Sequence, residues 1–338
     1  MQLIGDYLLK QNILVKKDKF PILDNIDVII FDIDGVLVNV SASYHQSVID
    51  TVQYYFTHII RKAGKEKLVD RQIINSFKLV GGFNDDWELT AAVILYYLWK
   101  MKQSKLNTLE KLKDSPPTID EFIGENLSAG DGLSQLHMWI KENASDPDEI
   151  FSLWHKEKIF QIAKEFYAGK KYCYRFYNFY PEFIKKNNGN IESETILINP
   201  EATQILKNYN MGILTGRDKA ETRYILNKIG WESIIKPEMI ITSQDNKKKK
   251  PSPEGLEYLI DTSSSKTGLY IGDTMADLLT VKNFNKQHKK QQCMFALILD
   301  NKFAGDGYRI QKENFLDKGV DFLAENVNQI ISLVHNKN

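Results

Sequence analysis

The sequence predicts an α/β protein with a doubly wound parallel sheet and a second, mainly helical domain inserted after the first core strand. Three observations predict this architecture. From about residue 195 onward, short apolar runs alternate with helical periodicity, which is typical of a parallel sheet wrapped by helices. Helical periodicity also fills residues 41–167, directly after the first such run. Finally, two carboxylates, Asp32 and Asp34, follow that run, where open α/β sheets place their ligands.

The first strand is predicted over residues 27–31, an apolar run that suits a fully buried position. In an extended segment residues i and i+2 share a face, so Asp32 and Asp34 are expected to point into one cleft. Their mutual repulsion then requires a cation or a proton, and Mg²⁺ is the natural candidate. Gly35 permits the tight turn that follows. Taken alone, this motif also fits a solvated Asp-Gly turn.

The inserted domain is predicted over residues 41–191, and the core over residues 1–40 and 192–338. Thr215 follows Asp32 by 183 positions, far more than one helical crossover between neighbouring strands requires. Within the insertion, loops are predicted around residues 104–120 and 128–132, with a further break at residues 146–148.

The rest of the core reads as alternating strands and helices. Residues 195–198 lead into the first helix, and strands are predicted over residues 211–214, 239–242, 269–271 and 294–299. Helices are predicted over residues 201–209, 219–229, 254–261, 276–283 and 320–334.

Three more motifs follow the aspartate pair in order, and the set is far more specific than any single one. They are Leu214-Thr215-Gly216-Arg217, Lys250-Pro251-Ser252-Pro253, and Gly272-Asp273-Thr274-Met275-Ala276-Asp277. With these four motifs, the sequence resembles the haloacid dehalogenase superfamily, subfamily I. The segment of residues 78–90, with Ser41, Ser43 and Tyr44, resembles the cap signature of a poorly characterised phosphatase-like subgroup within it. The resemblance implies a Rossmann-like core, a large helical cap of the C1 type, and an Mg²⁺-dependent phosphatase acting on a small phosphorylated metabolite.

Each step of phosphate-monoester hydrolysis has a candidate residue. Asp32 would attack phosphorus and form an aspartyl-phosphate, while Asp34 would act as general acid and then as general base. A hydroxyl and an amide, from Thr215 and Gly216, would hold a phosphoryl oxygen. Lys250 would balance the negative charge, with Lys249 as the alternative in the same lysine run.

The expected metal ligands are the Asp32 carboxylate, the Asp34 main-chain carbonyl and Asp273. Asp277 lies one helical turn after Asp273, so it would bind the metal directly or through water. Taken alone, Gly272-Asp273 would fit a helix N-cap better than a metal site.

Substrate contacts are expected from Gly216, from Arg217 and from the cap segment of residues 78–90, in particular Lys78, Asn84 and Trp87. Two alternatives remain open for these residues. Residues 84–86 would also suit a helix N-cap with Trp87 packed in the cap core. Arg217 would grip an acidic group or face solvent.

Composition narrows the class of partner. Lys+Arg 44 balances Asp+Glu 44, so nothing favours nucleic acid or an anionic membrane, and a small-molecule partner is expected. The two cysteines, Cys173 and Cys293, lie far apart and outside the motifs, which predicts free thiols and a cytoplasmic protein. We expect no signal peptide and no membrane span. Homo-oligomerisation is left open.

Three alternative functions remain. A phosphomutase of the same superfamily would use both aspartates but retain a bisphosphorylated intermediate. A haloacid dehalogenase fits less well, because Asp34 would have no role in its chemistry. A non-catalytic binding or regulatory module would keep the fold without turnover.

Overall fold

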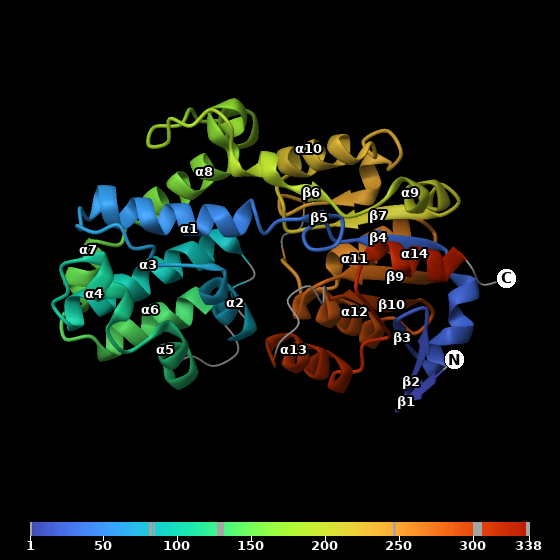
Figure 1. The fold of residues 1–338 in the computed structure, drawn as a ribbon. Helices are drawn as coiled ribbons and strands as arrows, with labels where there is room; N and C mark the ends of the chain where they lie inside the picture. The colour runs from blue at the N-terminus through green and yellow to red at the C-terminus, as the bar shows by residue number, and fades with distance from the viewer. Residues whose placement is uncertain are drawn as a thin grey trace. The chain divides into compact units, whose positions relative to one another are not determined.

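The computed structural model describes residues 2–80, 83, 85–126, 132–245, 248–299 and 306–335 of the chain (Figure 1). The chain divides into two compact units. One joins Met1–Asn39 to Thr195–Asn338 and is called the core unit below; the other, Val40–Glu194, is called the inserted unit. The sequence-based expectation puts the boundaries at residues 1–40 with 192–338 and at residues 41–191.

The core unit is built on one sheet with the strand order β1-β2-β3-β11-β10-β9-β4-β7-β8. Its strands are β1 (Gln2–Ile4), β2 (Tyr7–Lys10), β3 (Ile13–Lys16), β4 (Val28–Phe31), β7 (Asn210–Leu214), β8 (Ile240–Ile241), β9 (Thr267–Gly272), β10 (Gln292–Ile298) and β11 (Phe322–Ala324). The strands from β11 to β8 are parallel, whereas β1, β2 and β3 form an antiparallel meander against β11. The predicted doubly wound parallel sheet is confirmed, with this meander added at one side.

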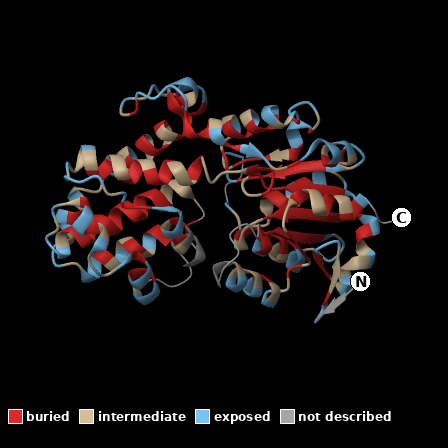
Figure 2. Ribbon diagram, viewed as in Figure 1, coloured by how far each residue is buried: buried red, intermediate tan, exposed pale blue. Residues whose placement is uncertain are grey.

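The central strands are apolar along their whole length because both faces of the sheet are covered. Every residue of β4 and of β9 is buried, as Figure 2 shows for the middle of the sheet. Strand β4 lies between β9 and β7, with Phe31 opposite Ile271 on one side and Ile213 on the other. The Phe31 ring packs against the indole of Trp231, with ring centroids 5.4 Å apart. The residues that follow these three strands are therefore brought together at one edge of the sheet.

Helices cover both faces of this sheet. They are α9 (Pro200–Leu206), α10 (Lys219–Ile229), α11 (Glu254–Thr262), α12 (Met275–Gln287), α13 (Asp306–Asp317) and α14 (Val327–His335), with the short helices η1 (Lys17–Asn25) and η4 (Pro237–Met239). Right-handed crossovers put α9 and α10 on one face and α11, α12 and α13 on the other. In agreement with this, α9 packs on α14 and α11 packs on α12. The winding direction reverses between β4 and β9, which is where such sheets bind ligands.

The inserted unit is helical in all its described elements. They are α1 (Tyr44–Tyr54) with the continuing turn η2 (Tyr55–Ile59), α2 (Arg71–Val80), α3 (Asp86–Gln103), α4 (Leu109–Asp114), α5 (Ile119–Asn126), α6 (Gly132–Asn143), α7 (Pro147–Ser152), α8 (Lys156–Tyr177) and η3 (Asn190–Ser193). Helix α3 is buried from Leu89 to Met101 and packs against α1, α6 and α8, so it forms the centre of a separate apolar core. Within the described ranges, no helix is long and apolar enough to cross a membrane.

A small two-stranded sheet pairs the end of the first part of the core unit with the start of the second part. Strands β5 (Val38–Asn39) and β6 (Thr195–Ile196) pair antiparallel in a sheet of their own. Both residues of β6 are exposed, and they lie in the segment expected to lead into the helix over residues 201–209.

Two parts of the core unit differ from the sequence-based expectation. The predicted helix over residues 320–334 is wrong, because its first part forms strand β11 beside β10 and α14 begins only at Val327. The buried side chains of Phe322, Leu323 and Ala324 fit either periodicity, so the run alone could not separate a short strand from a helix. The meander β1–β3 and helix α13 were not anticipated.

Candidate active site

The first site residue, Asp32, is fixed at the point where β4 ends. Its amide donates to the carbonyl of Ile271 in β9 (2.9 Å), and its Oδ1 accepts a hydrogen bond from the Ile33 amide (2.7 Å). The chain then turns sharply, because the Ile33 carbonyl accepts from the amides of Leu37 and Val38. Asp32 is only 6% exposed, so its carboxylate lies within the protein with one oxygen held by the backbone.

Gly35 lies in this turn and directly faces Asp273. Its φ is +71°, a backbone conformation that residues with a side chain rarely adopt. A Cβ at this position would lie 2.1 Å from Asp273 Oδ2. Asp273 itself follows β9, the strand next to β4. The absence of a side chain at Gly35 thus lets the Asp273 carboxylate approach the turn that carries Asp34.

Asp277 is buried at the start of α12 and is held by four donors. Oδ2 accepts from the amide (3.0 Å) and the hydroxyl (2.6 Å) of Thr274, and the Asp277 amide donates back to Thr274 Oγ1 in a capping box. Oδ1 accepts from Lys250 Nζ (2.6 Å) and from the Tyr270 hydroxyl (2.8 Å). Four donors match the roughly four lone-pair positions of a carboxylate, so Asp277 is saturated by protein groups. The N-cap is Thr274 rather than Asp273.

Lys250 connects the buried acids. Its ammonium lies 2.8 Å from Asp32 Oδ2, 2.6 Å from Asp277 Oδ1 and 3.2 Å from the Tyr270 hydroxyl. Burial favours the neutral amine, but the charges of Asp277 and Asp32 outweigh it and raise the pKa of Lys250 well above its usual value. Of the two candidate lysines, Lys250 is therefore the one that contacts the site, while Lys249 is exposed.

The same environment acts in opposite directions on the two carboxylates. Burial raises the pKa of Asp32 to about 6, helped by the charges of Asp277 and Asp34 and opposed by Lys250. Burial also acts to raise the pKa of Asp277, but Lys250 and the other hydrogen-bond donors outweigh it and lower that pKa below its usual value. The shared surroundings thus favour the charged form of Asp277 and the protonated form of Asp32.

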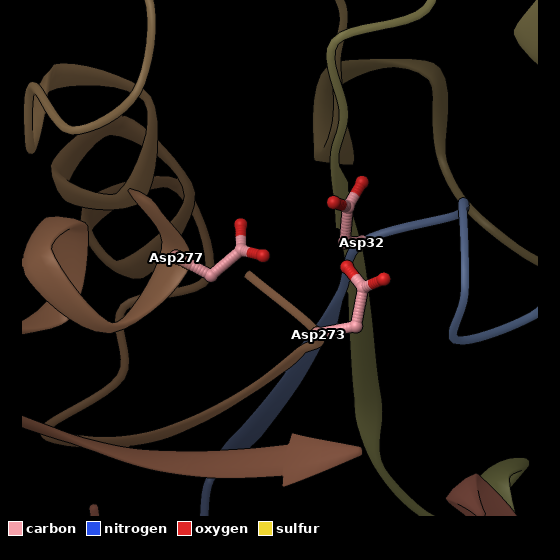
Figure 3. Close-up of side chains that lie close together, drawn as sticks. All are labelled: Asp32, Asp273 and Asp277. Carbon is pink, nitrogen blue, oxygen red and sulfur yellow. The ribbon is translucent and has the colours of Figure 1, made fainter. Parts of the chain in front are cut away.

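Three of the acids lie close enough to hold a metal ion. One oxygen from each of Asp32, Asp273 and Asp277 can be chosen so that all three lie within 4.8 Å of one another. Figure 3 shows these side chains converging from the ends of β4 and β9 and from the first turn of α12. Oxygen donors of this kind suit Mg²⁺, so the donor set fits the expected ion.

The residues after β7 lie beside the same turn. The Thr215 amide donates to Ile241 in β8 (3.0 Å), and its hydroxyl accepts from the Arg217 amide (3.3 Å). Gly216 is exposed, with nothing within 4 Å of where its side chain would be. Arg217 is 2% exposed and does not face solvent: its Nε and Nη2 lie 2.7 and 2.6 Å from Asp34 Oδ1. The acidic group that it grips thus belongs to the protein itself.

The three cap residues proposed for substrate recognition belong to the inserted unit. Asn84 lies outside the described residues, and Lys78 is on α2, with its side chain also outside the description. Trp87 is in the first turn of α3, whose N-cap is Asp85, and its ring packs on Tyr44 and Tyr167 at 5.3 and 5.7 Å. The N-cap of the alternative interpretation is present at Asp85, and Trp87 is partly buried against these two tyrosine rings.

The sequence did not identify Tyr270 as a site residue, although it lies in the strand predicted over residues 269–271. It is completely buried, and burial with the charge of Asp277 raises its pKa well above the usual value. Its hydroxyl oxygen also lies 3.2 Å from the carbonyl oxygen of Leu214 in β7, so the side chain crosses β4 and reaches the strand on its other side. All six residues of β9 are buried, so no alternation in the sequence could distinguish this side chain.

Comparison with known proteins agrees with this geometry. Residues 157–288 match the family model of haloacid dehalogenase-like hydrolases. Residues 157–288 are thus similar to a haloacid dehalogenase-like hydrolase. The expected superfamily and the hydrolase class are confirmed by this match, which includes the segments of Thr215, Lys250 and Asp273 but not that of Asp32.

Solved structures share the fold of this hydrolase. Phosphatase Tt82 from Thermococcus thioreducens is 23% identical, with a TM-score of 0.57 over 80% of this chain and 92% of that one. A structural-genomics target is 17% identical, with a TM-score of 0.60 over 92% of this chain and 99% of the other. At these identities the likeness establishes the fold.

A curated relative is similar over part of its length. The imidazoleglycerol-phosphate dehydratase of Phytophthora nicotianae is 31% identical over 151 residues, which are 45% of this chain and 29% of that protein. The hydrolase thus spans less than a third of the length of the curated relative that it matches.

Proposed function

We propose that the hydrolase is an Mg²⁺-dependent phosphatase that hydrolyses a small phosphorylated metabolite through an aspartyl-phosphate. The observation that carries the proposal is the arrangement around Asp32: a buried carboxylate at a strand end, with Lys250 on one oxygen and Asp273 beside it. A carboxylate held in this way suits nucleophilic attack, which needs a fixed direction and charge balance.

The residues divide the reaction between them. Asp32 attacks phosphorus as the bond from phosphorus to the leaving oxygen breaks, and Asp34 gives its proton to that oxygen so that an alcohol departs. In the second step Asp34 takes a proton from water, whose oxygen bonds to phosphorus and releases Asp32 and inorganic phosphate. Thr215 and the Gly216 amide bind phosphoryl oxygens, and Lys250 offsets their charge.

The carboxylates of Asp32 and Asp273 and the main-chain carbonyl of Asp34 would hold Mg²⁺. The bound ion would supply positive charge against the phosphoryl oxygens. Asp277 is instead assigned to Lys250, because its oxygens already accept four hydrogen bonds from protein groups. Its proposed role is to hold the lysine in place beside Asp32.

The first experiment is a panel of phosphorylated metabolites assayed for phosphate release with and without Mg²⁺. We expect metal-dependent release from at least one compound, and a loss of more than about 10³-fold in Asp32→Asn because the nucleophile is removed. Asp24→Asn makes the same chemical change at an exposed aspartate of the core unit and should keep full activity.

Three results would contradict the proposal. Release that persists in Asp32→Asn would exclude Asp32 as the nucleophile. Isomerisation of a phosphosugar without phosphate release, and only with a bisphosphate activator, would identify a phosphomutase. No turnover with any compound by a folded, Mg²⁺-binding protein would favour a binding module.

A further inference from the structure

The contact between Arg217 and Asp34 has an asymmetric geometry. Two guanidinium donors, Nε at 2.7 Å and Nη2 at 2.6 Å, both point to Oδ1 of Asp34. The structure describes no hydrogen bond from any residue to the other oxygen, Oδ2, within the ranges that it covers. The Arg217 side chain is 0% exposed, whereas that of Asp34 is 33% exposed. One oxygen of this acid is therefore held from inside, and the carboxyl group as a whole still reaches solvent.

The backbone amide and carbonyl of Arg217 each make a hydrogen bond within the core unit. Its amide donates to Thr215 Oγ1 (3.3 Å), and its carbonyl accepts from the Ser243 amide (3.0 Å) in the segment after β8. The next residue, Asp218, accepts a hydrogen bond from the Ser243 hydroxyl (2.7 Å) and is the N-cap of α10. The backbone of Arg217 is thus held by hydrogen bonds and its side chain is buried, whereas Asp34 lies on a tight turn outside the sheet. A planar guanidinium also restricts the direction of its partner more than an ammonium would.

We propose that Arg217 is a positioning residue for proton transfer: it fixes Oδ1 of Asp34 so that Oδ2 exchanges the proton with the leaving oxygen and then with water. The proposal rests on the proposed phosphatase function and replaces the expected substrate contact of Arg217. Both donors on one oxygen leave a single oxygen for the proton. A general acid works only when that oxygen lies within hydrogen-bond reach of its target.

The two proton transfers predict an unusual kinetic signature. In the first step Asp34 gives a proton to the leaving oxygen, which matters for phenolate but little for 4-nitrophenolate, a stable anion. In the second step Asp34 takes a proton from water, whatever group has left. Misplacing Asp34 should therefore slow the first step for phenyl phosphate only, and the second step for both substrates.

The test measures the first turnover of phenyl phosphate and 4-nitrophenyl phosphate by the full-length protein with Mg²⁺. In Arg217→Gln we expect the first-turnover rate to fall about tenfold or more with phenyl phosphate and less than about threefold with 4-nitrophenyl phosphate. Because the second step is slowed, 4-nitrophenolate should appear in a burst equal to the enzyme concentration. Asp34→Asn should show the same selectivity, and the double variant should be no worse than Asp34→Asn alone.

Arg217→Lys and Arg223→Gln complete the set. Arg217→Lys keeps the buried charge without the planar guanidinium. The ratio of its first-turnover rates on the two substrates should therefore shift in the same direction by a smaller factor. If Arg217→Gln does not fold, this variant tests the proposal instead. Arg223 is an exposed arginine of α10 paired with Glu232, and its glutamine variant should match the wild type. Equal losses on both substrates, or an unchanged ratio in Arg217→Lys, would overturn the positioning role. Wild-type protein that hydrolyses neither compound nor any metabolite would instead count against the phosphatase itself.

Discussion

At the scale of single residues, the sequence located the acids better than it located their partners. Asp32, Asp273 and Lys250 could be placed in one site because each follows a motif strand or precedes a proline in a known order. The partner of Asp34 could not be found in this way, because Arg217 is 183 positions away and its type suits substrate binding equally well. Tyr270 was missed for a different reason, since a fully buried strand carries no alternation.

The close approach of Gly35 and Asp273 gives a residue-scale expectation. Gly35→Ala should weaken Mg²⁺ binding by about tenfold or more, because its Cβ would displace the Asp273 carboxylate. Isothermal titration with Mg²⁺ measures this. Gly230→Ala is the matched control, since Gly230 also has a positive φ, +83°, but nothing lies within 4 Å of its added carbon. Both variants should lose about 1–2 kcal/mol of stability from backbone strain, but only Gly35→Ala should lose metal affinity.

At the scale of elements, strand ends were more predictable than the short elements at the margin of the sheet. The order of β4, β7 and β9 follows from buried apolar runs and right-handed crossovers, and it brings the motif residues together. Residues 320–334 could not be divided correctly, because a three-residue strand depends on its neighbour β10 rather than on its own pattern. The meander β1–β3 likewise depends on pairing with β11, a contact over more than 300 positions.

The capping box of α12 joins an element's stability to the site. In Thr274→Ala the helix loses its N-cap, and we expect the free energy of unfolding to fall by about 1 kcal/mol. Asp277 also loses a hydroxyl donor, so its hold on Lys250 should loosen and kcat should fall by about tenfold. Thr108→Ala removes the N-cap of α4 in the inserted unit and should cost similar stability with unchanged kcat. Equal kcat values in Thr274→Ala and Thr108→Ala would show that the capping box of α12 does not affect catalysis.

At the scale of the whole molecule, the hydrolase consists of two units with separate cores, and every group of the proposed site other than the cap residues lies in the core unit. The sequence predicted an insertion because of the distance between the first two motifs. The ligand of the inserted unit does not follow from the sequence, because residues 84–87 suit a helix start as well as a substrate contact; in the structure Trp87 packs on Tyr44 and Tyr167.

The raised pKa of Asp32, about 6, gives an expectation for the stability of the whole protein. The unfolded value is about 3.9, so this group stabilises the fold fully below pH 4 and loses that contribution as pH rises through 6. Mg²⁺ must displace the proton, so its apparent affinity should be about tenfold weaker at pH 5 than at pH 7.5. Melting temperatures across an Mg²⁺ titration at both pH values measure this. The pH dependence should flatten in Asp32→Asn; equal affinities in the wild type would show that Asp32 is not a ligand.

The packing of Phe31 on Trp231 has an optical consequence. Trp231 is the one tryptophan in the sequence of the core unit, since the other four, Trp87, Trp99, Trp139 and Trp154, belong to the inserted unit. Its indole is buried and contacts the ring that directly precedes Asp32. A protein in which phenylalanine replaces those four would emit from a single indole next to the nucleophile's strand. The fluorescence of that indole would then follow events at one end of β4 without any attached dye.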